Sequence, residues 1–249
     1  MRSQLFNNME QQSAAPGFAL QNSKLLKATV NGEFFSRRGA MVAYQGNVRF
    51  EHQGITSGEG TMKDKLMRAA KGAISGEGVP LMKVVGQGEV FLADDAADIF
   101  LVDLDGSDAL SINGSNILAF ESSLSWDIKL VANAGALAGA GLFNTIVSGT
   151  GRVAITSRGT PVVLQTDEAP TFVDPNAAIC WSANLAVNVT RTEGIALFGR
   201  SAGEAMQMNF SGPGFVVVQP SEGPVGIGQS GAQQNQSKGG VLGGLLGGN

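Results

Sequence analysis

A glycine motif that occurs three times at a constant spacing limits the fold of this chain more than any other feature. Residues 86–88, 149–151 and 212–214 each read Gly-x-Gly, and their first glycines stand 63 residues apart. Apolar residues follow at the fifth and seventh positions, as Val90 and Leu92 do in the first copy. Because every second side chain of a strand lies on the same face, each copy predicts a turn that leads into a strand with one apolar face.

A second pattern, a small residue followed by an aromatic one, occurs once in each third of the chain. Its copies are Ala43-Tyr44, Ala119-Phe120 and Cys180-Trp181. A branched apolar residue follows each aromatic residue after four positions, namely Val48, Leu124 and Leu185. We expect the three aromatic side chains to occupy matching places in the fold, on the opposite face of the strand from the small residue.

The two patterns together predict an all-β fold made of three related units. The chain has 35 glycines and only 15% charged residues, which favours turn-rich β structure over a helical bundle. Stacked repeats share one core and are not independent domains. We expect a single β domain over residues 20–220, with units at 20–85, 86–148 and 149–220 around a pseudo-threefold axis.

Several segments stand apart from this pattern. Residues 1–19 form a polar leader that we expect to be loosely tied, adding at most an edge strand. Residues 61–71 predict a short basic helix, which either closes one end of the β core or makes peripheral contact with a membrane or an acidic partner. Residues 221–249, rich in Gly, Gln and Ser, are expected to be disordered. Inside the domain, Asn31-Gly32 predicts a tight hairpin.

Composition and charge disfavour several classes of function. The net charge is −4, whereas nucleic-acid binding relies on clustered Lys and Arg. A zinc or iron centre needs two or three His or Cys ligands, and the chain has one of each, His52 and Cys180. Cys180 stands in an apolar run, so we expect a buried, unreactive thiol. No secretory signal and no apolar run of about 20 residues is present, so we expect a cytoplasmic protein without a transmembrane segment.

Two glycine motifs resemble functional sites, and each has a simpler explanation. Residues 199–203 match the Gly-x-Ser-x-Gly nucleophile elbow around Ser201, but no His follows to act as the base. Residues 149–154 match the loose dinucleotide fingerprint, but the β-branched residues and the Pro that follow cannot open the long helix that such a site needs. We interpret both as turns.

Carboxylates provide two further candidates. Residues 103–108 carry three aspartates around a glycine and resemble a calcium loop, but the third regularly spaced ligand and the distal Glu are absent. We expect a hairpin with solvated aspartates there. A hydrolytic pair hidden among Glu77, Glu204 and the aspartates has no support beyond the presence of these residues. We therefore expect no catalytic residue, no cofactor and no metal.

Several segments, taken in their order along the chain, resemble the family of the altered inheritance of mitochondria protein 24. The clearest is residues 39–48, which read GAMVAYQGNV and resemble the GSMVAMxGxV signature of that family. The resemblance covers residues 20–219, and other similar segments are residues 73–78, 86–93, 118–120 and 210–216.

This resemblance implies a fold of repeated β units similar to the tryptophan RNA-binding attenuation protein, of β-sandwich or double-stranded β-helix type. It implies no catalytic residues, since none is established for the family, whose specific role is unknown. Mitochondrial members are associated with inner-membrane organisation and respiratory-complex stability. The resemblance therefore also implies support of membrane-associated complexes.

The sequence leaves three kinds of function open. The first is a non-enzymatic structural or interaction protein that forms a homo-oligomer or binds other proteins, because many short strands leave edges that must be covered or paired. The second is a nucleic-acid or small-ligand binding module, by analogy of fold alone. The third is a carboxylate-based hydrolase, which no motif supports.

Overall fold

The structure, a computed structural model, describes residues 3, 16–52, 81–130, 143–191 and 206–221. This part of the chain is all β, as the sequence predicts, with fourteen strands and no helix. The strands are β1 Gly17–Asn22, β2 Leu25–Arg37, β3 Met41–His52, β4 Leu81–Leu92, β5 Asp98–Asn113, β6 Ile117–Glu121, β7 Ser125–Leu130, β8 Phe143–Ser157, β9 Val162–Gln165, β10 Thr171–Val173, β11 Ala178–Ser182, β12 Ala186–Arg191, β13 Met206–Ser211 and β14 Phe215–Val218.

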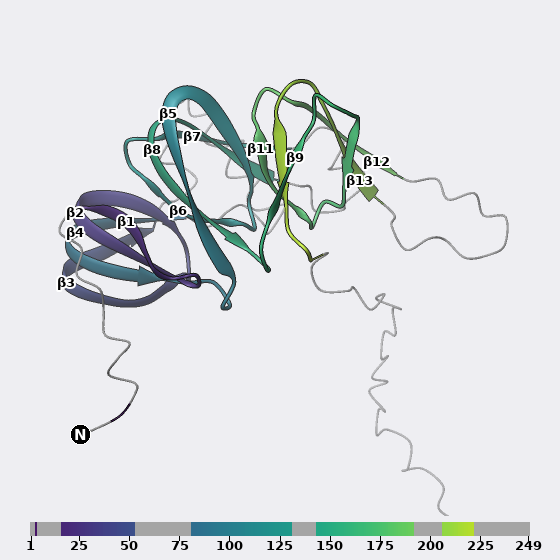
Figure 1. The fold of residues 1–249 in the computed structure, drawn as a ribbon. Coiled ribbons are helices and arrows are strands. Elements are labelled where there is room, and N and C mark those ends of the chain that lie inside the picture. Colours follow the sequence, from purple (N-terminus) through teal and green to yellow (C-terminus); the bar gives the residue numbers. More distant parts are fainter. Residues whose placement is uncertain (1–2, 4–15, 53–80, 131–142, 192–205, 222–249) are drawn as a thin grey trace, which may run out of the picture.

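The strands form three groups, β1–β4, β5–β8 and β9–β14, that follow one order of pairing (Figure 1). The main sheet runs β3-β4-β2, then β6-β8-β5, then β11-β14-β9. We number the strands of each triplet first, middle and last by their order along the chain. In every triplet the last strand lies in the centre of the sheet and pairs with both the first and the middle strand. We call β4, β8 and β13/β14 the central strands. Additional strands β1 and β7 pair with β2 and β8, and β10-β13-β12 forms a separate three-stranded sheet in the same central order.

Two junctions of the same kind join neighbouring groups. At the first, β2 pairs with β6, and Phe35 lies opposite Phe120. At the second, β5 pairs with β11, and Ser111 lies opposite Trp181. Each junction joins the first strand of one group to the middle strand of the next.

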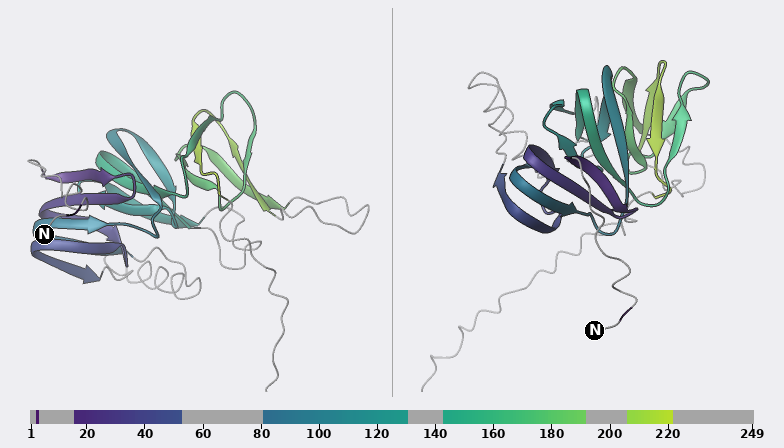
Figure 2. Two further views of the ribbon diagram at one scale, coloured as in Figure 1. Left: turned by 60° about the horizontal axis from the view of Figure 1, so that its bottom comes forward. Right: turned by 60° about the vertical axis from the view of Figure 1, so that its left-hand side comes forward.

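The pseudo-threefold axis and the likeness to the tryptophan RNA-binding attenuation protein are not confirmed. The three groups lie in a row, with β3 at one end and β12 and β13 at the other (Figures 1 and 2). Among the described strands, β3 and β9 end the main sheet order and do not pair with each other. The unit boundaries at residues 86 and 149 also stay a prediction.

The Gly-x-Gly motifs lie where strands bend, and we call these bends corners. The prediction that each motif is a turn preceding a strand is wrong for the first two copies. Residues 86–88 lie inside β4 and residues 149–151 inside β8, while residues 212–214 separate β13 from β14. Gly86 and Gly88 have φ angles of 138° and 154°, and a Cβ on either would lie 2.1 Å from a backbone oxygen of β3. Glycine is needed there because the neighbouring strand approaches so closely.

The tight hairpin predicted at Asn31-Gly32 is also wrong, because β2 continues through both residues. Gly32 lies opposite Gly86, and its φ angle of 127° belongs to the same bend. Because the strand bends at the corner, its two halves pair with different strands. In β8, the half before the corner pairs with β7 and the half after it pairs with β6.

One backbone hydrogen bond recurs in all three groups. An amide at the end of the central strand donates to a carbonyl in the turn between the first and middle strands. The three pairs are Ala93 N to Ala40 O at 2.9 Å, Thr156 N to Asn116 O at 2.8 Å, and Gln219 N to Ala177 O at 2.9 Å. The donors stand 63 residues apart, as the Gly-x-Gly motifs do.

The three aromatic residues of the second sequence pattern also have matching partners. Tyr44, Phe120 and Trp181 lie opposite the fifth residue of the Gly-x-Gly motif on their central strands, which is Val90, Val153 and Val216. Their environments differ, since Phe120 is 0% exposed and Trp181 3%, whereas Tyr44 is 48% exposed. Tyr44 lies on β3, at the end of the row.

Several predictions concern residues that the structure does not describe. The helix at 61–71, the Ser201 motif, Glu77 and Glu204 lie outside the described residues, and so does the tail from residue 222 onward. At the other end, β1 begins at Gly17 and pairs with β2, so residues 17–19 of the expected leader lie in a strand, and Phe18 is buried.

Candidate functional site

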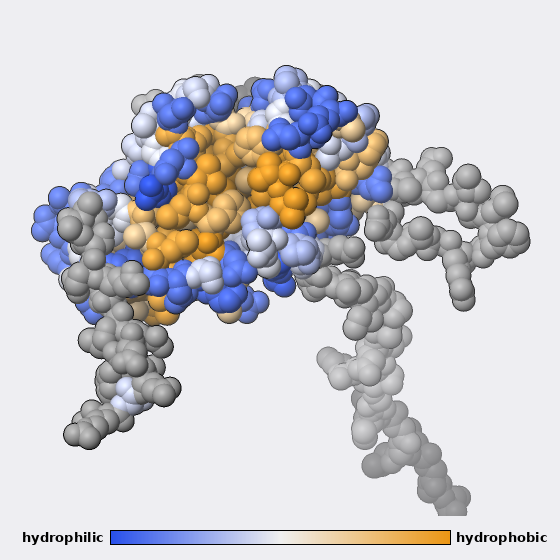
Figure 3. Space-filling model, viewed as in Figure 1, coloured by the Kyte–Doolittle hydropathy of each residue, from blue (hydrophilic) through white to orange (hydrophobic). Residues whose placement is uncertain are grey.

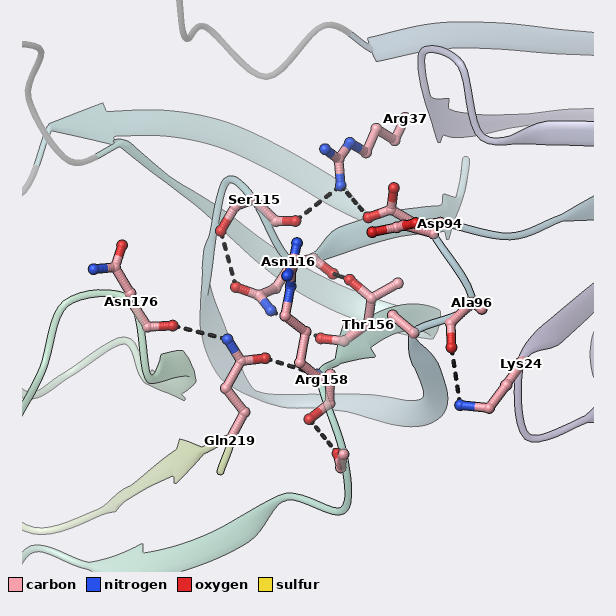
Figure 4. Close-up of a pocket in the computed structure, with 14 residues that line it drawn as sticks. Lys24, Arg37, Asp94, Ala96, Ser115, Asn116, Thr156, Arg158, Asn176 and Gln219 are labelled. Carbon is pink, nitrogen blue, oxygen red and sulfur yellow. Dashed lines mark hydrogen bonds and ion pairs between the residues drawn. The ribbon is translucent and has the colours of Figure 1, made fainter. Parts of the chain in front are cut away.

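A polar cleft of about 690 Å³ lies where turns from all three groups meet (Figure 4). Its charged side chains are the cations Lys24, Arg37 and Arg158 and the carboxylates Asp94 and Asp95. These residues come from the β1–β2 turn, the end of β2 and the segments that follow β4 and β8. The mixture of signs favours neither an anionic nor a cationic ligand.

Hydrogen bonds and ion pairs across this cleft brace neighbouring groups. Arg37 Nη1 forms an ion pair with Asp94 Oδ2 at 2.5 Å and donates to Ser115 O at 2.9 Å. Lys24 Nζ pairs with Asp98 Oδ1 at 3.0 Å. Two of the three cations therefore tie the first group of strands to the second.

The polar residues deeper in the cleft are engaged in the same way. Asn116 Nδ2 donates to Thr156 O at 2.9 Å. The Gln219 side chain accepts from Arg158 N at 2.9 Å and donates to Asn176 O at 2.8 Å. Two hydroxyls of the lining donate to backbone carbonyls, Thr156 Oγ1 to Asn116 O at 3.1 Å and Ser157 Oγ to Gly159 O at 2.6 Å. The described cleft can bind small polar groups, but its present contacts serve to hold turns together.

A second cluster of charges joins β1 to the second group. Arg152 on β8 pairs with Asp103 on β5, with Nε to Oδ1 at 2.5 Å and Nη2 to Oδ2 at 2.9 Å. Its Nη1 also donates to Phe18 O on β1 at 2.9 Å. The hydrogen bond from Arg152 holds the pKa of Asp103 below its ordinary value. This bidentate pair is a brace between three strands.

The aspartates of residues 103–108 do not form the predicted hairpin but lie along β5, where a bulge follows Asp105. Asp105 Oδ1 accepts from Ser107 N at 2.9 Å and from Ser107 Oγ at 2.6 Å. These bonds lower the pKa of Asp105. Among the described residues, no group of three His, Cys, Asp or Glu side chains is placed to hold a metal ion.

The structure places two other sequence candidates in strands. Cys180 on β11 is 1% exposed, and burial raises the pKa of its thiol to about 12. The thiol is therefore protonated near neutral pH and is a poor nucleophile. Residues 149–154 lie within β8, which continues to Ser157, so no helix N-terminus follows the motif that resembles a dinucleotide site.

The feature that the sequence patterns do not reveal is a set of exposed apolar residues on strands at the ends of the sheets. All large apolar side chains that are exposed in the described part of the chain lie on β1, β3, β9 or β10. They are Leu20, Met41, Val42, Tyr44, Val162, Val163, Leu164 and Phe172. Figure 3 shows apolar surface over β9. Apolar side chains on an unpaired strand mark a surface that another chain can cover.

Comparison with known proteins identifies the family. The sequence model described as Mitochondrial biogenesis AIM24 matches residues 18–221. This chain belongs to the AIM24 family. The match runs from the second residue of β1 to beyond the end of β14 and confirms the resemblance found in the sequence. AIM24 membership links the chain to mitochondrial biogenesis without assigning a specific role.

A solved structure supports the fold of this AIM24-family chain. The X-ray crystal structure of the protein SPYM3_0169 from Streptococcus pyogenes is similar, with a TM-score of 0.64 and 19% sequence identity over 82% of this chain and 92% of that one. At this identity the likeness shows the fold alone. No curated protein matches the sequence. In the part of the chain that the structure describes, no helix is long and apolar enough to cross a membrane.

Proposed function

We propose that this AIM24-family protein is a non-enzymatic structural protein that acts as an assembly of several copies. The observation that carries the proposal is the placement of the exposed apolar residues. Tyr44 and Phe172, 48% and 55% exposed, lie on β3 and β10, which end the main sheet and the three-stranded sheet respectively.

The sequence of these edges supports the same proposal. Natural edge strands are usually protected by Lys, Pro or inward-pointing charge, because unpaired backbone groups attract other strands. Residues 41–45 of β3 read MVAYQ, and β10 reads TFV, so neither stretch has a charged residue. An unprotected apolar edge favours a surface that is covered when the protein functions.

The chemistry of the cleft lends no support to a hydrolase. A carboxylate hydrolase needs one carboxyl to act as an acid while the other acts as a base or nucleophile. Of the two carboxylates that line the cleft, Asp94 is instead paired with Arg37. The proposal therefore assigns the cleft a role in holding the groups together.

The family description suggests the setting of the assembly. We propose that the assembled protein supports membrane-associated complexes by binding other proteins, and that it needs no membrane span of its own. The cytoplasmic location expected from the sequence stays a prediction, which fractionation of the source cell tests.

Light scattering after size-exclusion chromatography tests the proposal. The chain has a mass of 25.7 kDa, and we expect the measured mass to be a multiple of this value that falls on dilution. A mass of one chain at every concentration up to the limit of solubility would overturn the proposal.

A further inference from the structure

We infer that copies of this chain join head to tail, with β10 of one copy pairing antiparallel with β3 of the next and Phe172 stacking on Tyr44. The inference rests on the proposed function, because it specifies how the copies assemble. It assigns both the surface and its occupant, a second copy of the same chain.

The two internal junctions define what is missing at the ends of the row. Each internal junction joins the first strand of one group to the middle strand of the next, as β2 joins β6 and β5 joins β11. The third group has no following group for β10, and the first has no preceding group for β3. Within the described residues, β10 pairs only with β13, and β3 only with β4. These two edges are the two sides of a third junction.

The two sides of this junction cannot meet within one chain in this structure. β3 lies at one end of the row, while β13, the partner of β10, lies at the other (Figures 1 and 2). Within the described residues neither β3 nor β10 pairs with a further strand, and the inference assigns that place to a second copy.

Equivalent residues of the three first strands follow from their partners on the central strands. Phe35, Ser111 and Phe172 hold the same place, because their partners are spaced by 63 residues along the chain. Those partners are Lys83, Ile146 and Asn209. Phe172 therefore takes the position that Phe35 has at the first junction.

The register of the new junction follows from this equivalence. Phe35 lies opposite Phe120, and Ser111 lies opposite Trp181. Phe120 and Trp181 are both aromatic residues of the second sequence pattern. The remaining member of that pattern is Tyr44. Phe172 of one copy thus lies opposite Tyr44 of the next.

The aromatic contacts of the first junction show what Phe172 adds. Phe35 stacks on Phe120 with ring centroids 5.2 Å apart and an interplanar angle of 24°. Trp126 lies 5.8 Å from Phe35 and 5.9 Å from Phe120, which completes a cluster of three rings.

The first group contains the same cluster without its third ring. Tyr44 and Phe50 occupy the places of Phe120 and Trp126, with centroids 5.3 Å apart. The place of Phe35 in this cluster is the one that Phe172 fills. Both Tyr44 and Phe172 are about half exposed in the single chain, so pairing them removes apolar surface from water.

Charges beside the two edges are complementary in this register. Asp167 and Glu168 precede β10, and Arg49 follows Tyr44 on β3, and all three side chains are exposed. In an antiparallel pair with Phe172 opposite Tyr44, the acidic segment runs toward Arg49 of the next copy. Opposite charges at the rim favour this orientation over a pairing of two identical edges.

Such a junction uses a different surface on each copy. The β10-β13-β12 sheet of one copy becomes continuous with β3 and β4 of the next, as β5 is continuous with β11 inside the chain. A contact of this kind closes into a ring if the rotation between copies allows it, and otherwise extends as a filament.

Two charge variants test the direction of assembly. Tyr44→Asp blocks the β3 edge, and Phe172→Asp blocks the β10 edge, so we expect each variant alone to have the mass of one chain. When they are mixed, the intact β10 of the first variant meets the intact β3 of the second. We expect a 1:1 dimer and nothing larger, measured by light scattering.

Controls separate the junction from other effects. Val163→Asp places the same charge on β9, outside the junction, and should keep the wild-type mass; loss of assembly in this variant would assign the contact to β9 and overturn the inference. Circular dichroism checks that each variant is folded. If either aspartate variant unfolds, Tyr44→Lys and Phe172→Lys replace it, because both side chains are about half exposed in the single chain and the junction would have to bury the added charge.

The outcomes distinguish the inference from the function on which it rests. If the wild-type chain stays monomeric, both the proposed assembly and the head-to-tail junction are wrong. A wild-type assembly that either variant alone retains, or a mixture that fails to form the dimer, overturns the head-to-tail junction but leaves the assembly in place.

Discussion

At the scale of single residues, equivalent side chains differ in burial, and burial decides how much each contributes to the stability of a single chain. Phe120 is 0% exposed and packs on Phe35 of the neighbouring group. Trp181 is 3% exposed and packs on Phe210 of its own group, whereas Tyr44 is 48% exposed. We expect Phe120→Ala and Trp181→Ala each to lower the free energy of unfolding by roughly 3–5 kcal/mol. Tyr44→Ala should cost a single chain far less. Urea unfolding of dilute protein measures this, and equal losses at the three positions would contradict it.

The ion pair of Asp103 with Arg152 makes a second prediction at this scale. The pKa of Asp103 is lower in the folded protein than its unfolded value of about 3.9. The pair therefore stabilises the fold above this pH, and the stabilisation is lost as the pH falls through the lower folded pKa. Because the Asp103 side chain is 67% exposed, the effect is small.

Thermal melts over a pH series check this effect. Asp103→Asn should lower the melting temperature slightly near neutral pH, and the difference from the wild type should vanish in strong acid. A difference that persists in acid would show that the carboxylate acts through something other than its charge.

At the scale of the strands, the glycine corners are the critical elements. Gly86 and Gly32 lie opposite each other, and both have positive φ, so an alanine at either strains the backbone by about 1–3 kcal/mol. They differ in space, because a Cβ at Gly86 would lie 2.1 Å from Asn47 O, while one at Gly32 has no neighbour within 4 Å. Gly86→Ala should therefore destabilise more than Gly32→Ala.

Chemical denaturation of the two glycine variants measures the difference. The Gly32→Ala variant is the matched control for backbone strain. Equal midpoints for the two variants would mean that β3 can move away from β4 at the corner.

The same corners show what the sequence can predict about elements. The alternation around Val90 and Leu92 identifies strands correctly. However, a hairpin turn and a bend in a continuous strand both need residues that tolerate positive φ, and Asn31-Gly32 satisfies either. The choice depends on pairing with β4, a partner about fifty residues away, and local sequence does not contain this information.

At the scale of the whole molecule, the sequence predicts an all-β chain with three related parts but not their arrangement. Closure around an axis depends on the small rotation between successive groups, which is a sum of strand twists and not a local pattern. Of the two aromatic residues on the candidate surface, the sequence patterns single out one. Tyr44 stands out through its likeness to Phe120 and Trp181, whereas the place of Phe172 at a free edge follows from its register opposite Asn209.

A crosslinking measurement tests the head-to-tail assembly most directly. Residues opposite each other in an antiparallel pair have Cβ atoms about 4.5–5.5 Å apart, close to the separation that a disulfide bridges. Copies with Tyr44→Cys are mixed with copies with Phe172→Cys under mild oxidation, and the buried Cys180 stays unreactive as an internal control. We predict a disulfide-linked dimer that contains one copy of each variant, detected by mass spectrometry. Dimers of either variant with itself at equal yield, or no crosslink in a sample that scatters as an assembly, would contradict the account.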